Sequence, residues 1–157
     1  QLIFSTIHTN DAASGFTRLL NWDVEPFLIA STVKGILAQR LVRRICNECK
    51  ESYSPNENEL EMIGLDKDDP IEAYKGKGCL ACRNTGFKGR IGIYELLLMD
   101  GEISELVLNQ EPGYKIREQA RANGMTTLLE DGLIKIKRGD TTISEVYQTL
   151  GTSKIVL

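Results

Sequence analysis

The sequence predicts an α/β protein with three parts: a parallel sheet with helices, a small metal-binding module and a C-terminal helical bundle. Residues 1–7 read Q-L-I-F-S-T-I, and their bunched apolar residues are typical of a buried strand in a parallel sheet. Two Cys-x2-Cys pairs follow, and beyond residue 99 the apolar residues recur at helical spacing. We expect the three parts to span residues 1–45, 46–98 and 99–157.

Composition is that of a globular protein in water. Of the 157 residues, 41% are hydrophobic and 26% are charged, and no apolar run approaches the roughly 18 residues of a membrane span. No signal peptide opens the chain, which predicts a cytosolic location. The formal charge is −3, and aromatic residues are not interleaved with the basic ones, which argues against a nucleic-acid binder.

The one histidine of the chain, His8, stands between the expected first strand and a helix that Asn10 or Asp11 can cap. Ligands of open α/β sheets bind at such a place, and the N-terminus of a helix favours anions. A lone histidine is more often structural than functional. Position alone therefore leaves both roles open for His8.

Two more elements complete the first part. A second helix is expected to begin at Pro26 and to close near Gly35. Residues 36–45, I-L-A-Q-R-L-V-R-R-I, could prolong this helix, but we expect a strand that leads into the first cysteine pair. Gln39 and Arg40 interrupt its apolar run, so the simplest interpretation is an edge strand with Arg40 in solvent.

The metal-binding module contains every cysteine of the chain: Cys46, Cys49, Cys79 and Cys82. Each two-residue gap lets a tight turn aim both sulfurs at one point, so the spacing predicts a four-thiolate site with zinc as the ion. With all four positions filled by protein, the zinc would be structural. A zinc-ribbon nucleic-acid binder and a rubredoxin-like iron site remain as alternatives.

Other residues of this module form a short acidic helix at 55–64 and a strand at 90–99 that carries Tyr94 and Glu95. The simplest role for Glu95 is to pair with an arginine. Basic residues crowd both cysteine pairs, where they either offset the charge of the metal site or form a contact surface. They are Lys34, Arg40, Arg43, Arg44 and Lys50 around the first pair, and Lys75, Lys77, Arg83, Lys88 and Arg90 around the second.

The last part predicts four helices. They lie around residues 103–107, over residues 115–122, between Thr126 and Gly139, and from Thr142 or Ser144 onward. This part carries no cysteine or histidine, and its sequence offers no nucleophile–base arrangement. We expect residues 151–157 to be frayed.

Five motifs, in order, resemble segments of the ATPases of type II secretion and type IV pilus assembly. S-T-I-H-T-N-D-A (residues 5–12) resembles their histidine box, and E-P-F-L-I-A-S-T-V (25–33) and L-A-Q-R-L-V-R (37–43) resemble the segments after it. The cysteine pairs with G-R-I-G-I-Y-E-L-L (89–97) resemble their zinc-binding insertion. D-G-L-I-K-I-K-R-G and T-T-I-S-E-V resemble their C-terminal helical region.

The resemblance implies a RecA-like core, of which residues 1–45 form a part, in a hexameric cytoplasmic motor at the inner membrane. Such a motor hydrolyses ATP with magnesium to drive secretion or pilus extension. His8 resembles the histidine near the γ-phosphate, and Cys46, Cys49, Cys79 and Cys82 resemble the zinc ligands. Gln39 and Arg40 belong to a family motif. The implied partner is the inner-membrane platform protein of the machine.

The sequence departs from the family in one respect. It contains no phosphate-binding loop of the form G-x-x-x-x-G-K-S/T, and the family's upstream magnesium-binding acids are also missing. We therefore expect the C-terminal piece of a motor, unable to hydrolyse ATP alone. The alternative is a zinc-stabilised interaction module that docks on the platform protein through its basic residues.

Overall fold

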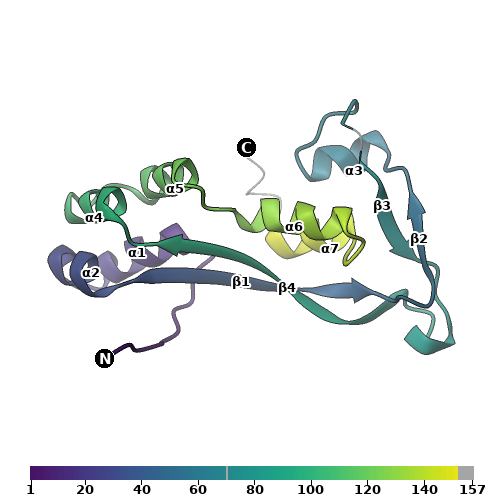
Figure 1. Cartoon of the computed structure of the whole chain (residues 1–157), viewed down its shortest axis with the longest axis horizontal. Coiled ribbons are helices and arrows are strands. Elements are labelled where there is room, and N and C mark those ends of the chain that lie inside the picture. Colours follow the sequence, from purple (N-terminus) through teal and green to yellow (C-terminus); the bar gives the residue numbers. More distant parts are fainter. Residues whose placement is uncertain (70, 152–157) are drawn as a thin grey trace. The chain divides into compact units, whose positions relative to one another are not determined.

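The computed structural model describes residues 1–69 and 71–151, which group into two compact units (Figure 1). The first unit contains residues 1–39 and 94–127, and the second contains residues 40–93 and the chain from 128 onward. Strands β1 (Gly35–Ile45) and β4 (Phe87–Leu98) each contribute residues to both units. The division into parts 1–45, 46–98 and 99–157 stays a prediction.

Strands β1 and β4 form an antiparallel ribbon. At one end the Met99 amide donates to the Lys34 carbonyl at 2.9 Å, and at the other the Cys46 amide donates to the Gly86 carbonyl at 2.9 Å. The arrows of β1 and β4 accordingly run in opposite directions in Figure 1. The expected strand at residues 36–45 is thus confirmed, but Arg40 is partly buried rather than in solvent.

The expected parallel sheet, and with it a partial RecA-like sheet, is not found among the described residues. Residues 1–9 form neither helix nor strand, and Leu2, Ile3 and Phe4 are 70%, 75% and 90% exposed. In the described chain the strands pair only as β1 with β4 and β2 with β3, so no strand lies beside residues 1–7. The expectation of a buried strand was wrong because such a strand requires hydrogen-bonded neighbours.

The first unit contains four helices: α1 (Ala12–Asn21), α2 (Pro26–Thr32), α4 (Gly101–Leu108) and α5 (Gly113–Ala122). Helix α1 begins where expected, because the Asp11 side chain accepts a hydrogen bond from the Ser14 amide. Helix α2 packs on α4, and α1 packs on α5. Their buried side chains include Phe16, Ile29 and Ile116, which form much of the core of this unit.

The second unit contains strands β2 (Lys50–Tyr53) and β3 (Ala73–Gly76), helices α3 (Glu57–Met62), α6 (Leu128–Lys137) and α7 (Ile143–Leu150), and the 3-10 turn η1 (Leu80–Cys82). Strands β2 and β3 are antiparallel, with Lys50 opposite Gly76. Helix α3 has a capping box in which the Asn56 and Glu59 side chains each accept from the other's amide. The core contains Ile63, Ala73, Ile136, Ile143 and Val146.

All four helices expected after residue 99 are present, divided between the two units. Thr142 is the N-cap of α7, as its side chain accepts from the Glu145 amide. The sequence predicts a frayed tail at residues 151–157, of which residues 152–157 lie outside the described residues. None of the described helices is long and apolar enough to cross a membrane.

Candidate functional site

The four cysteines come together in the second unit. The Sγ–Sγ distance is 3.9 Å from Cys46 to Cys79, 3.9 Å from Cys49 to Cys82 and 3.7 Å from Cys79 to Cys82, and all four sulfurs lie within 4.8 Å of one another. Cys46 directly follows β1, Cys49 directly precedes β2, and Cys79 and Cys82 belong to the turn around η1. The structure therefore gathers sulfurs from two chain segments.

Two tight turns aim the sulfurs inward. In the first, the Cys49 amide donates to the Cys46 carbonyl at 3.3 Å. In the second, the amides of Cys82 and Asn84 donate to the Cys79 carbonyl, at 3.2 and 2.9 Å. Gly78 permits the second turn, since its φ is +92° and a Cβ there would lie 2.9 Å from the Asn84 carbonyl oxygen.

The cluster has the size that a tetrahedral zinc site requires. Four sulfurs at about 2.3 Å from one ion would be separated by about 3.8 Å. Three of the six Sγ–Sγ distances are 3.7 to 3.9 Å, and the others are at most 4.8 Å. The amides of Cys79 and Gly86 each donate to the Cys82 sulfur at 3.2 Å. Such hydrogen bonds stabilise thiolate, the form in which sulfur binds a metal.

The thiols differ in acidity. Burial raises the pKa of Cys49 to about 12. Burial also raises the pKa of Cys82, but the hydrogen bonds from the Cys79 and Gly86 amides, and those from the Cys79 and Cys49 thiols, outweigh it and bring this pKa down to about 6. A divalent ion would release the remaining thiol protons on binding.

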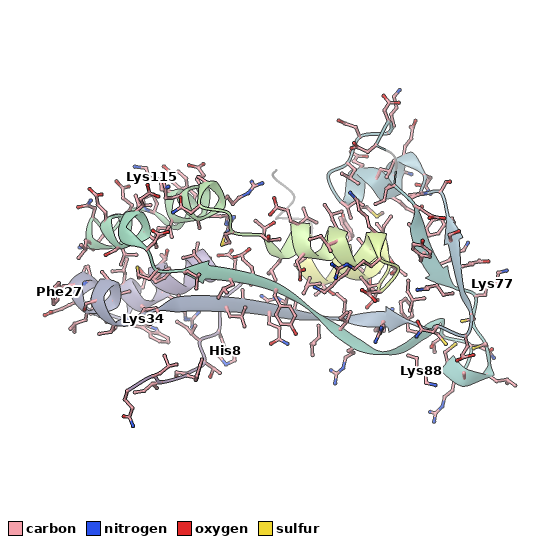
Figure 2. The ribbon with its side chains drawn as sticks, viewed as in Figure 1. His8, Phe27, Lys34, Lys77, Lys88 and Lys115 are labelled. Carbon is pink, nitrogen blue, oxygen red and sulfur yellow. The ribbon has the colours of Figure 1, made fainter. Side chains whose placement is uncertain are left out.

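The basic residues around the cysteines fall into two groups. Several are paired: Lys77 contacts Glu51 at 2.7 Å, and Arg44 contacts Asp140 at 3.7 Å. Arg83, Lys88 and Arg90 are exposed. Figure 2 places Lys88 near η1, which carries Leu80, a side chain that is 92% exposed. This exposed group, defined here as the basic rim (Arg83, Lys88 and Arg90), borders the cysteine cluster in sequence.

His8 belongs to the first unit, whereas the cysteines belong to the second. It lies on the segment that precedes α1 and is exposed (Figure 2). No hydrogen bond or ion pair joins its imidazole to any residue that the structure describes. The residues just after it are held firmly, because the Thr9 hydroxyl donates to the Asp11 carbonyl at 3.0 Å and Arg117 donates to the Asp11 carboxylate at 2.6 Å.

The N-terminus of α1 is occupied by side chains of the chain itself. The Ser14 amide donates to Asp11 and the Ala12 amide donates to Glu95, both at 2.8 Å. Glu95 is thus an anchor of α1, and its pairing with an arginine stays a prediction. No spacing in the sequence indicates this contact, since Ala12 and Glu95 are 83 positions apart.

The sequence also missed a polar network in the second unit. Arg43 donates to the Glu145 carboxylate through its Nη2 at 2.6 Å, its Nε at 2.9 Å and its own amide at 2.8 Å. The Arg43 guanidinium lies 4.2 Å from the centre of the Phe87 ring. The Thr141 hydroxyl donates to the Arg43 carbonyl at 2.8 Å. This network joins the start of α7 to β1.

Glu145 is 7% exposed, so its charge depends on these hydrogen bonds. Burial raises its pKa, but the hydrogen bonds from the Arg43 side chain and amide outweigh burial and bring the pKa below its ordinary value of 4.5. A carboxylate with a lowered pKa stabilises the fold above the pKa of the unfolded state. That contribution is lost as the pH falls through the lower pKa of the folded state.

We therefore expect Glu145→Ala to destabilise the region around α7 by about 2–3 kcal/mol at neutral pH, less than for a fully buried pair because Arg43 is half exposed. Glu145→Gln should lower the stability of this region less than Glu145→Ala does. The difference in stability between Glu145→Gln and the wild type should shrink below about pH 4. Hydrogen exchange of the α7 amides measures both effects. Glu61→Gln, at an exposed position of α3, is the matched control; a Glu145→Gln variant that behaves like it at every pH would refute the expectation.

Known proteins match almost the whole chain. Residues 1–148 match the family described as "Type II/IV secretion system protein". The type IV pilus assembly ATPase PilB of Thermus thermophilus is 46% identical over 147 residues, which is 92% of this chain and 16% of that protein. The type II secretion system protein E of Pseudomonas aeruginosa is 40% identical over 147 residues, which is 94% of this chain and 29% of that protein.

The type II secretion system ATPase E of Vibrio cholerae is also 40% identical over 147 residues, which is 94% of this chain and 29% of that protein. The chain thus spans less than a third of the length of each of these relatives. The matched residues include the histidine segment and all four cysteines. The resemblance found in the sequence motifs is confirmed, and the chain belongs to the family of type II/IV secretion system proteins.

Proposed function

We propose that this chain is the C-terminal part of a hexameric cytoplasmic ATPase that works at the inner membrane and powers type II secretion or type IV pilus assembly. The observation that carries the proposal is the family match over residues 1–148. The sequence lacks a phosphate-binding loop, so on this proposal the loop and the magnesium-binding acids belong to another part of the gene product.

The proposal is tested with the full-length gene product. We expect the purified protein to hydrolyse ATP in the presence of Mg²⁺, and deletion of its gene to abolish either pili or the export of secreted proteins. A full-length product that forms hexamers but hydrolyses no ATP would contradict the proposal.

His8 is proposed to sense or polarise the γ-phosphate of ATP in the assembled motor. Two observations support this role over that of a structural histidine: the imidazole is exposed, and it has no hydrogen-bond partner among the described residues. A structural histidine is normally buried and hydrogen-bonded. We do not assign it as a general base, because the loose transition state of phosphoryl transfer depends mainly on positioning and charge stabilisation.

Zn²⁺ is proposed to bind Cys46, Cys49, Cys79 and Cys82 as a structural ion. The supporting observations are the Sγ–Sγ distances of 3.7 to 3.9 Å and the four protein ligands, which leave no position for water or substrate. When bound, the ion supplies a cross-link between the chain after β1 and the chain around η1. A rubredoxin-like iron site would colour the purified protein, so a colourless protein argues for zinc.

A second role, as a docking module for the inner-membrane platform protein, is favoured by one feature. Leu80 is 92% exposed at the tip of the second cysteine turn, and the basic rim follows it in sequence. The three cations of the basic rim pair with no residue that the structure describes. An exposed apolar side chain close to such cations in sequence is a suitable contact for an apolar pocket bordered by acidic residues.

We expect the triple change of Arg83, Lys88 and Arg90 to Glu to weaken capture of the platform protein of the same machine at least tenfold. Like charges would then oppose association. The matched control is Lys67→Glu, at an exposed position away from the cysteines in sequence. Unchanged zinc content verifies that the triple variant is folded, and undiminished capture would exclude the basic rim as the contact.

A further inference from the structure

Two buried carboxylates from distant parts of the sequence hold the first turn of α1. Glu95 on β4 is 3% exposed, and its Oε1 accepts from the Ala12 amide at 2.8 Å. Asp11 is 5% exposed, and its Oδ1 accepts from the Ser14 amide at 2.8 Å. The positive end of the helix dipole offsets these two negative charges. The start of α1 is therefore anchored to β4 within the first unit.

A second set of contacts, one of them from α5, holds the segment that precedes α1. Arg117 on α5 donates to Asp11 Oδ2 at 2.6 Å, and the Thr9 hydroxyl donates to the Asp11 carbonyl at 3.0 Å. Asp11 therefore links α1, the segment at Thr9 and α5. Together with Glu95, these contacts form what we call the carboxylate clamp (Asp11, Glu95 and Arg117), and they fix residues 9 to 12.

The residue just before this fixed segment is His8. Its backbone is joined to Thr9, whereas its exposed imidazole has no hydrogen bond to any described residue. Because residues 9 to 12 are held, the imidazole can move mainly by the backbone torsions between His8 and Thr9 and by its two side-chain torsions. The clamp thus restricts the position of the imidazole but makes no hydrogen bond to its ring nitrogens.

We propose that Glu95 and Asp11 are positioning residues that hold His8 where it meets the γ-phosphate. This inference rests on the proposed function of His8. The two carboxylates act through the backbone of residues 9 to 12 and contact no nucleotide. A displacement of about 1 Å at a reacting group can cost about a hundredfold in rate, so a buried clamp next to His8 has a direct effect on turnover.

The experiment is a double-mutant cycle in the full-length gene product. Glu95→Ala should lower kcat about tenfold, with KM for ATP changed less than about twofold. Glu95→Gln keeps an acceptor oxygen for the Ala12 amide and should restore most of the rate. In a His8→Ala background, Glu95→Ala should have no further effect on kcat. Glu105→Ala, at an exposed position of α4, is the control.

Hydrogen exchange of the Ala12 amide provides a readout that does not depend on ATP. Glu95→Ala should speed this exchange at least tenfold, since the amide loses its acceptor, and Glu95→Gln should not. If Glu95→Ala does not fold, Arg117→Gln, on the half-exposed side of the clamp, takes its place with the same predicted loss of kcat.

The outcomes separate the inference from the function on which it rests. An equal loss of kcat from Glu95→Ala with and without His8 would overturn the positioning role. If His8→Ala leaves turnover unchanged, the proposed role of His8 fails on its own account. The positioning role then falls with it, and the anchoring of α1 by Glu95 is judged separately: faster exchange of the Ala12 amide in Glu95→Ala supports the anchoring, and unchanged exchange overturns it.

Discussion

Replacing Cys46 with serine is expected to release the metal and unfold the region between β1 and β4 that holds the cysteine cluster. Cys46 is fully buried, and its loss would leave only three sulfurs for the proposed zinc ion. The binding of structural zinc contributes about 10–16 kcal/mol in small zinc domains, as much as the total stability of many proteins. The two-stranded sheet of β2 and β3 is too small to replace that contribution.

Metal analysis and hydrogen exchange of the full-length gene product measure this effect. The wild type should contain one zinc per chain, the variant should contain none, and the amides of β2 and β3 should lose their protection. The control is Leu80→Ser, which changes an exposed residue of the second cysteine turn. This variant should keep its metal, and its β2 and β3 amides should stay protected from exchange. A Cys46→Ser protein that contains no metal but whose β2 and β3 amides remain protected from hydrogen exchange would refute a structural role for the ion.

The local features of this fold could be predicted from the sequence because short stretches of chain determine them. Asp11 at the start of α1 and Thr142 at the start of α7 are caps whose partners lie three residues away. The two Cys-x2-Cys turns are equally local, so the cysteine cluster was predictable from spacing alone.

The features that the sequence could not predict depend on distant residues. Residues 1–7 have the composition of a buried strand, but a strand forms only beside a neighbour, and the described residues provide none. The contacts of Glu145 with Arg43 and of Glu95 with Ala12 span 102 and 83 positions. No periodicity or spacing encodes such pairs, although all four of these residues lie within motifs that the sequence singled out.

His8→Ala is expected to have the largest effect on the activity of the motor. The full-length variant should bind ATP with a Kd within about threefold of the wild-type value, because the proposed phosphate-binding loop is untouched. Its turnover should fall about a hundredfold, the cost of removing one group that stabilises charge developing in a transition state. Ser5→Ala, at an exposed position of the same segment, should leave both quantities unchanged.

On the proposed function, the chemistry of the motor depends on His8, and the cysteine cluster maintains the fold. The most direct test is the rate of phosphate release at saturating ATP, measured on the full-length wild type, Ser5→Ala and His8→Ala. We predict equal rates for the first two and a rate about a hundredfold lower for His8→Ala at unchanged zinc content. A His8→Ala protein that releases phosphate as fast as the wild type would contradict the claim.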